Sequence, residues 1–265
     1  MIVEAIGSDH AGIGARAAVH FEITLRRMMA GPQSVQNPRY LRLLTGEAHP
    51  LGNMAIVAEP GNLDAALEAI EPLLDCGAPS AAIFPRGVDP AVANAVKERG
   101  FAVEAAMPAM AVEIDRLAPA ALPPGYAWAR IGAGDEGRAW TEALAIGYEL
   151  PRALAGLFAP DALGADMAPD APIQFFAVLR NDRPVATTML FLADGLAGIY
   201  CVSTRPEERN RGLGAYATAE ALRAARRVGY RVGVLQSSSA GYNVYVGLGF
   251  GTYAQVPMLV HMPAG

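Results

Sequence analysis

The sequence is poor in cysteine and lacks long apolar runs. Its 265 residues include two cysteines, Cys76 and Cys201, without the C-x-x-C or Cys/His spacing of a zinc site. Neither a disulfide framework nor a metal site is therefore indicated. No uncharged apolar stretch reaches the roughly 18 to 20 residues that a membrane helix needs. The N-terminus, MIVEAIGSDHAG, lacks the basic segment and apolar run of a secretory signal, so we expect a cytoplasmic protein.

Positive charge is also scarce. The formal net charge is -5, and no long tract of lysine and arginine is present. An electrostatic attraction to nucleic-acid phosphates therefore has little support. Small-molecule chemistry is the better starting class, and we expect neither a nucleic-acid nor a membrane partner.

Proline and glycine concentrate in RLAPAALPPG, residues 116–125, between two segments with regular apolar patterning. Such a composition is typical of an exposed linker, so we predict domains at 1–117 and 126–265, joined by residues 118–125. In the second domain the patterning predicts helices at 135–148 and 152–158, strands at 174–179, 185–192 and 196–202, a helix at 213–228 and a strand at 231–236. Asn181-Asp182 and Asp194-Gly195 suit tight hairpin turns. The predicted class is α/β (α+β), with a mixed, mostly antiparallel sheet flanked by helices.

The N-terminal half has a weaker version of the same layout. We predict strands at 54–58 and 80–84 and helices at 63–74 and 90–99. Gly100-Phe101 and Gly249-Phe250 are each followed by a proline seven residues after the phenylalanine, and an apolar strand is expected after each proline. The repeated order favours an internal duplication, that is, two tandem copies of one fold.

The segment that carries chemistry is residues 202–215, VSTRPEERNRGLGA, which runs from a strand through a loop into a helix. Its two glycines let an anion approach the backbone, and the free amides of the first helical turn point outward with the positive end of the helix dipole. A loop merely shaped by glycine is one alternative. Gly212, Gly214 and Ala217 also satisfy the dinucleotide pattern G-x-G-x-x-A, as do Gly12, Gly14 and Ala17, but the required acid on the next strand is missing because that strand ends in Gln236.

The segment RNRGLG at 209–214 resembles the Q/R-x-x-G-x-G/A signature of the GCN5-related N-acetyltransferases. Downstream, YVGLGF at 245–250 resembles the family's Y-x-x-x-G-F, preceded by a variant with Ser238 where many members have Asn. The resemblance covers about residues 126–262 and implies acetyl-CoA (coenzyme A) as cofactor. It assigns cofactor binding to Val202, Ser203, Thr204, Arg209, Asn210, Arg211, Gly212, Leu213, Gly214, Ala215 and Ser238.

The same resemblance implies that Tyr245 is the general acid that protonates the departing thiolate. A half-buried structural tyrosine is the alternative for this residue. No general base is evident, since Glu142 and Glu149 are as well explained as solvated helix residues and a water chain could serve. Residues 1–117 lack the R-x-x-G-x-G signature, so this copy is predicted to be degenerate and to shape the substrate cleft.

The resemblance implies an acetyl-CoA-dependent N-acetyltransferase in which a primary amine attacks directly within a ternary complex. The acceptor would be a small-molecule or peptide amine. The duplication suggests a monomer that is an internal pseudo-dimer, although a homodimer is also open. A non-catalytic acyl-CoA-binding or regulatory protein is the main alternative, and a nucleotide-binding oxidoreductase is a third.

Overall fold

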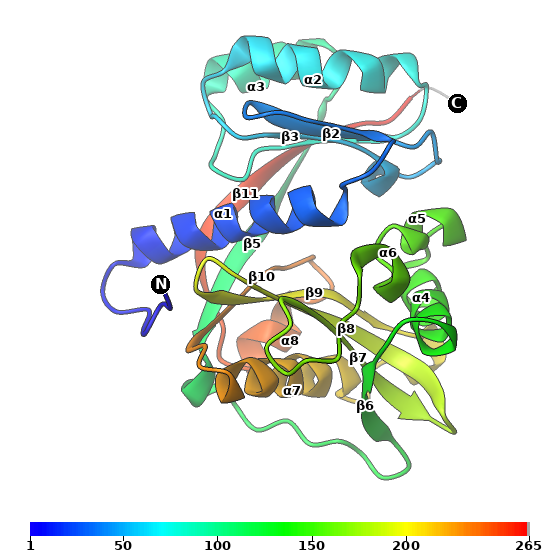
Figure 1. The fold of residues 1–265 in the computed structure, drawn as a ribbon. Coiled ribbons are helices and arrows are strands. Elements are labelled where there is room, and N and C mark those ends of the chain that lie inside the picture. The colour runs from blue at the N-terminus through cyan, green and yellow to red at the C-terminus, as the bar shows by residue number, and fades with distance from the viewer. Residues whose placement is uncertain (264–265) are drawn as a thin grey trace.

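Eleven strands form one continuous sheet that runs through both halves of the chain (Figure 1). The structure is a computed structural model and describes residues 1–263. The spatial order of the strands is β1-β2-β3-β4-β11-β5-β10-β9-β8-β7-β6. Their bounds are β1 Ser34–Gln36, β2 Tyr40–Leu44, β3 Asn53–Val57, β4 Ser80–Ile83, β5 Val103–Glu113, β6 Ala127–Ile131, β7 Ile173–Arg180, β8 Arg183–Ala193, β9 Leu196–Thr204, β10 Val232–Gln236 and β11 Gly251–His261. The α/β class with a mixed, mostly antiparallel sheet is confirmed.

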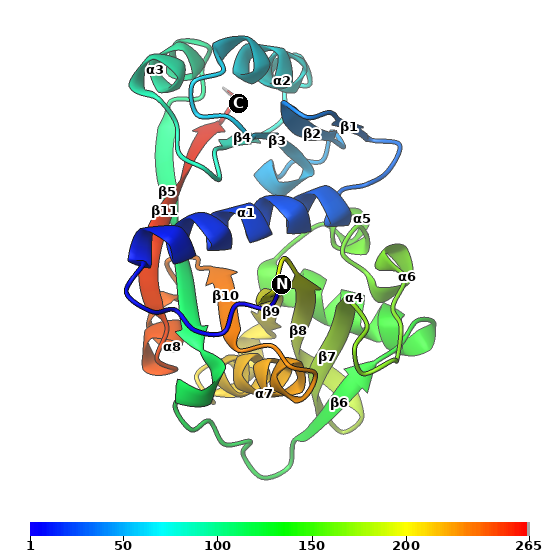
Figure 2. The ribbon, with the colours of Figure 1, turned by 60° about the vertical axis from the view of Figure 1, so that its left-hand side comes forward.

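Helices cover both faces of this sheet (Figure 2). One face packs against α1 (His10–Met28) and α4 (Asp135–Tyr148), followed by the short α5 (Arg152–Gly156) and α6 (Pro160–Leu163). The other face packs against α2 (Leu63–Asp75) and α3 (Pro90–Glu98) in the N-terminal half, and against α7 (Leu213–Arg227) and α8 (Tyr242–Gly247) in the C-terminal half. Among the described residues, none of the helices combines the length and apolar character that crossing a membrane requires.

The two halves repeat one order of elements and exchange their last strands. In each half a parallel strand pair encloses a helix, β3-α2-β4 in the first and β9-α7-β10 in the second. The last strand of each half then pairs with the other half: β5 with β10, and β11 with β4. β5 and β11 also pair with each other, with Met107 opposite Val256. Val256 follows Met107 by 149 positions, as Gly249 follows Gly100, so equivalent residues meet at a local two-fold axis. This symmetry supports the predicted duplication.

The predicted elements of the C-terminal half are found within one or two residues of their expected bounds, and α4 matches its predicted range. The turns form where asparagine, aspartate and glycine were expected: Asn181, Asp182 and Asp194 have φ of 49°, 59° and 47°, and Gly195 has 73°. These are left-handed conformations that such residues tolerate. The short helix after Pro151 ends at Gly156, two residues earlier than predicted.

Two predictions about the strands that contain the prolines were wrong. β5 begins five residues before Pro108 and β11 six before Pro257, so each proline lies inside its strand. The carbonyl of Pro108 accepts from the amide of Ser237, just past the end of β10, and the carbonyl of Pro257 accepts from Phe84, just past β4. A residue's N–H and C=O point to the same side of a strand, so the missing N–H of each proline faces a neighbour that ends there. The prolines therefore cost no ladder bond.

The sequence prediction also missed α1, which crosses the central strands between the two halves (Figure 1). Gly12, Gly14 and Ala17 lie inside this helix, so their match to the dinucleotide pattern has no strand-to-loop context. A Cβ atom on Gly14 would lie 2.5 Å from the carbonyl oxygen of Tyr253, so glycine allows α1 to pack closely on β11.

Candidate cofactor site

The loop between β9 and α7 presents a row of unpaired backbone amides. It makes a short 3-10 turn at Pro206–Glu208 and then adopts left-handed conformations at Asn210, with φ 63°, and Gly212, with φ 77°. Within residues 1–263, no protein group accepts a hydrogen bond from the amides of Asn210 to Ala215. Alternating left-handed residues before a helix turn successive N–H groups into one concave surface. Together with the positive end of the α7 dipole, this surface suits a phosphate.

The arginines of the loop are fixed by the protein. Arg209 donates from Nη2 to the carbonyl of Gly147 at 3.0 Å and from Nε to that of Thr204 at 3.3 Å, and so ties the loop to the end of α4. Arg205 donates to the carbonyl of Pro184. Arg211 lies 3.4 Å from the carboxylate of Glu208. These contacts stabilise the loop. The three guanidinium groups also keep positive charge close to the unpaired amides, which favours an anion there.

Glu208 anchors the loop to the region of β6 and β7. Its side chain is 7% exposed and accepts hydrogen bonds from the Tyr126 hydroxyl at 2.5 Å and from Arg180 Nη1 at 2.7 Å. The bond from Tyr126 and then that from Arg180 lower the pKa of this carboxyl, while its desolvation opposes them. An ionised Glu208 therefore fixes the loop to the outer strands of the sheet.

Beside this loop, the sheet opens between β9 and β10. The two strands pair in parallel at Ala197↔Gly233 and Gly198↔Val234; β9 then continues to Thr204, whereas β10 ends at Gln236. A β-bulge lies at this point, because Thr187 is opposite Ser203 while Met189 is opposite Tyr200. Cys201 in the bulge has a φ of 52°, an uncommon value for a non-glycine residue. The backbone of Val202 to Thr204 thus forms an edge that an extended ligand could pair with.

The residues around the opening fit a phosphate-bearing, extended cofactor. A Cβ atom on Gly212 would meet nothing within 4 Å, so space is free in front of the loop. A Cβ atom on Gly214 would lie 3.7 Å from Val202 Cγ1, an ordinary contact. The Ser203 hydroxyl is held inside the protein by Thr187 Oγ1 at 2.8 Å, which leaves the strand backbone as the part that could face a ligand. Leu213 is buried and anchors the start of α7.

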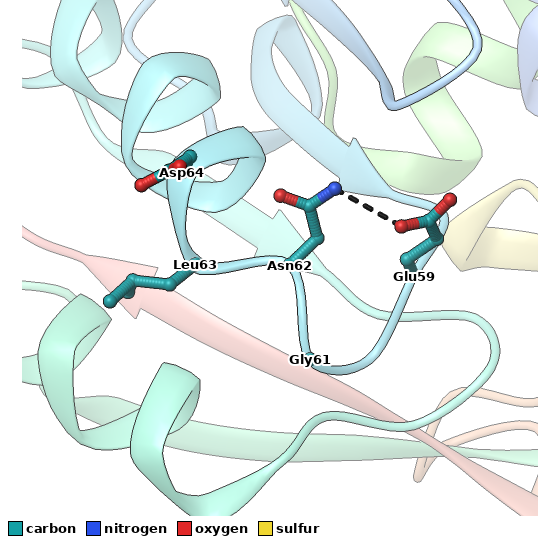
Figure 3. A pocket seen from close by; sticks show the side chains of 5 residues that line it. All are labelled: Glu59, Gly61, Asn62, Leu63 and Asp64. Atoms are coloured by element: carbon teal, nitrogen blue, oxygen red, sulfur yellow. Dashed lines mark hydrogen bonds between the residues drawn. The ribbon is translucent and has the colours of Figure 1, made fainter.

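The equivalent loop of the N-terminal half is closed to a phosphate. Asn62 caps α2 with its own side chain, which accepts from the amide of Ala65 at 3.0 Å, and its Nδ2 donates to Glu59 (Figure 3). The shallow hollow there is lined by Glu59, Gly61, Asn62, Leu63 and Asp64. Its carboxylates repel an anion, and the capping bond uses an amide that α7 leaves open.

Tyr245 lies on α8, on the α7 side of the sheet. The residue is 9% exposed and its ring packs edge-to-face on Phe250, with the ring centroids 5.8 Å apart. Burial raises the pKa of its phenol to about 12, so the hydroxyl stays protonated at neutral pH. Ser238 accepts from the amide of Gly241 at 3.2 Å in the turn that begins α8, so its hydroxyl supports this turn. The catalytic role of Tyr245 and the cofactor contacts predicted for the loop and Ser238 stay predictions.

Residues 139–250 match the model of the acetyltransferase (GNAT) family. The C-terminal half contains a GNAT domain. The matched segment begins in α4 and ends at Phe250, so it includes the loop, the opening between β9 and β10, and Tyr245. No curated protein sequence matches the chain.

Solved structures similar to this chain extend the likeness of fold beyond the GNAT domain. A GCN5-related N-acetyltransferase from Kribbella flavida is 24% identical, with a TM-score of 0.65 and coverage of 96% of both chains. One from Sphaerobacter thermophilus is 16% identical, with a TM-score of 0.61 and coverage of 97% of this chain and 93% of that chain. A tandem GNAT protein from the clavulanic acid biosynthesis pathway is 14% identical, with a TM-score of 0.55 and coverage of 99% and 98%. At these identities the likeness concerns the fold, and it spans both halves.

Sequence reasoning overlooked Tyr148, the last residue of α4, near the opening in the GNAT domain. Burial of its hydroxyl end raises the pKa of this phenol well above the usual range. The residue as a whole is 41% exposed, so its outer part stands at the rim of this region. The signal was present in the sequence, because a tyrosine at a helix end beside the acceptor region is a candidate contact, but nothing placed it near Tyr245.

The two carboxylates considered as bases are engaged at the surface. Glu142 lies 3.3 Å from Arg152, and Glu149 lies 3.7 Å from Arg209. Both side chains are exposed and point to arginines, so neither gains support as a base from its surroundings.

Proposed function

We propose that this protein is an acetyl-CoA-dependent N-acetyltransferase that acts on a primary amine by direct attack in a ternary complex. One observation carries the proposal: the unpaired amides of Asn210 to Ala215 lie beside the open edge of β9. In this arrangement the amides would hold the pyrophosphate and the strand edge would pair with the pantetheine arm. Bound acetyl-CoA supplies the activated acetyl group.

The protein's own residues would orient the cofactor and stabilise the leaving thiolate. Tyr245 stays protonated because burial raises its pKa to about 12, so it can donate a hydrogen bond to sulfur. We propose that the amine loses its proton to water, because Glu142 and Glu149 are bound to arginines at the surface. The acceptor would be a small molecule or a peptide.

The test is release of CoA thiol from acetyl-CoA over a panel of amine acceptors, combined with calorimetry of acetyl-CoA binding. We expect binding with one site and thiol release that depends on the acceptor. Tight binding without thiol release over a broad panel would instead support a non-catalytic acyl-CoA-binding protein. Absence of binding would contradict both functions.

A further inference from the structure

A buried histidine of the N-terminal half contacts the strand that borders the cofactor site. His20, on α1, is 0% exposed, and its Nδ1 lies 2.8 Å from the hydroxyl of Tyr200 on β9. The two rings are nearly parallel, with an interplanar angle of 7° and centroids 6.0 Å apart, and the ring of Phe21 lies at 14° to that of Tyr200. These partners are 180 positions apart in the sequence, one in each half.

Both partners of this hydrogen bond are uncharged at neutral pH. Burial lowers the pKa of His20 to about 4, although the carbonyls of Phe191 and Leu196 and the charge of Asp194 oppose this. Burial also raises the pKa of Tyr200 above its usual value. A neutral imidazole and a neutral phenol therefore meet. We assign the imidazole proton to Nε2, because the carbonyls of Phe191 and Leu196 at the ring can only accept, and Tyr200 then donates to Nδ1.

A glycine in β9 leaves room for the side chains of His20 and Tyr200. A Cβ atom on Gly198 would lie 2.2 Å from His20 Cε1 and 2.6 Å from Tyr200 Cε2, so no larger residue fits there. The carbonyls of Phe191 and Leu196 also lie close to the imidazole, but Nε2 makes no hydrogen bond of good geometry in the described part of the chain. The hydroxyl of Tyr200 is therefore the shortest polar contact of the ring.

Tyr200 lies where the sheet opens. Gly198 forms the last pair with β10, and Cys201, the next residue after Tyr200, has the left-handed conformation of the bulge. The carbonyl of Cys201 accepts from Thr187 Oγ1 at 2.8 Å, which fixes the bulge from β8. The contact with His20 fixes it from α1. Together the two contacts hold the backbone of β9 at the bulge from both sides of Cys201.

We propose that His20 is a positioning residue for acyl transfer, which holds Tyr200 and through it the bulge of β9 beside the reacting thioester. This inference rests on the proposed function. Under this proposal the N-terminal half contributes to acyl transfer, because its helix α1 determines the geometry of the β9 edge in the GNAT domain. Small errors of position at such an edge cost large factors in rate.

Three variants test this role in the full chain with acetyl-CoA and an active acceptor. Tyr200→Phe keeps the ring and removes the donor. His20→Leu removes the acceptor, whereas His20→Asn keeps an acceptor oxygen near the position of Nδ1. We expect Tyr200→Phe and His20→Leu to lower kcat at least tenfold, with KM for acetyl-CoA within about twofold, and His20→Asn to recover most of kcat. The double variant of Tyr200→Phe and His20→Leu should be no slower than the slower single variant, since the pair acts as a unit.

Ile13→Val is the matched control, since Ile13 is buried on α1 about two turns before His20 and its apolar side chain makes no hydrogen bond to His20 or Tyr200. It should leave kcat unchanged. A Tyr200→Phe protein that folds and turns over at the parent rate would overturn the positioning role, even if His20→Leu fails to fold. A parent protein that binds acetyl-CoA but transfers nothing would overturn the proposed function, and this inference with it.

Discussion

Gly212 offers a direct test of whether a phosphate sits against the first turn of α7. We consider Gly212→Asp and Gly212→Asn, which have nearly the same size and differ in charge. Gly212 has a φ of 77°, and asparagine and aspartate are among the residues that best tolerate this conformation. A Cβ atom here meets nothing within 4 Å, so both variants should fold like the parent. The two side chains would point into the same space in front of the amides.

The difference in affinity for acetyl-CoA between the two variants measures the effect of the carboxylate charge alone. A carboxylate about 5 Å from one phosphate charge, at an effective dielectric constant of about 40, is repelled by about 1.7 kcal/mol. This corresponds to an affinity for acetyl-CoA about 15-fold weaker for Gly212→Asp than for Gly212→Asn. Because exposed charges are screened, the gap should narrow as the ionic strength rises from about 0.05 to 0.5 M.

Isothermal titration calorimetry with acetyl-CoA measures both variants, and thermal unfolding verifies that they are folded to the same extent. Equal dissociation constants for the two variants at low salt would refute the reasoning, because a bound pyrophosphate against these amides must sense the added charge.

Four further predictions follow from the same structure. Tyr245→Phe should lower kcat by about 10- to 100-fold at constant KM, since a phenol with a pKa of about 12 supplies a hydrogen bond to sulfur more readily than a full proton; steady-state kinetics at the parent rate would contradict this. One acetyl-CoA should bind per chain, since Asn62 caps α2; a calorimetric stoichiometry of two would contradict it. Residues 126–265 alone should show no cooperative thermal transition by circular dichroism, because β10 and β11 lose β5; a transition like that of the whole chain would show the half to be independent. The pKa of His20 is lowered from 6.5 to about 4, so the stability that depends on its neutral form is present above pH 6.5 and is lost as pH falls toward 4. Urea unfolding should show that the free energy of unfolding decreases by up to about 3 kcal/mol over this range, and that His20→Asn abolishes this decrease.

The sequence was most informative where local chemistry decides the structure. The hairpin turns at Asn181-Asp182 and Asp194-Gly195 need residues that accept a positive φ, and these residues are visible in the sequence. The loop before α7 could likewise be identified from its glycines and arginines. Both the strands of the C-terminal half and the position of the loop could therefore be predicted from short segments.

Contacts between distant segments could not be predicted in this way. The helix α1 was missed because its buried face includes the polar residues His20, Glu22 and Thr24, which weaken the apolar periodicity. Glu22 is buried because Arg26 and Arg86 pair with it, and Arg86 is 64 positions away. The exchange of β5 and β11 depends on pairing across the two halves, which no local pattern encodes.

Pro108 and Pro257 illustrate the same limit. Proline inside a strand argues against a central position, and the sequence therefore indicated strands that begin after the prolines. The structure places each proline where its neighbouring strand ends, a coincidence that depends on the position of β10 or β4.

Hydrogen exchange of backbone amides with and without acetyl-CoA tests most directly the claim that the loop before α7 holds the cofactor. The amides of Asn210 to Ala215 are unpaired in the protein, so a bound pyrophosphate should slow their exchange markedly. The first turn of α2, capped by Asn62, serves as the internal control and should exchange at the same rate in both states. Protection of the α7 amides alone is the predicted result. Unchanged exchange at Asn210 to Ala215 under saturating acetyl-CoA, or protection at α2 instead, would contradict it.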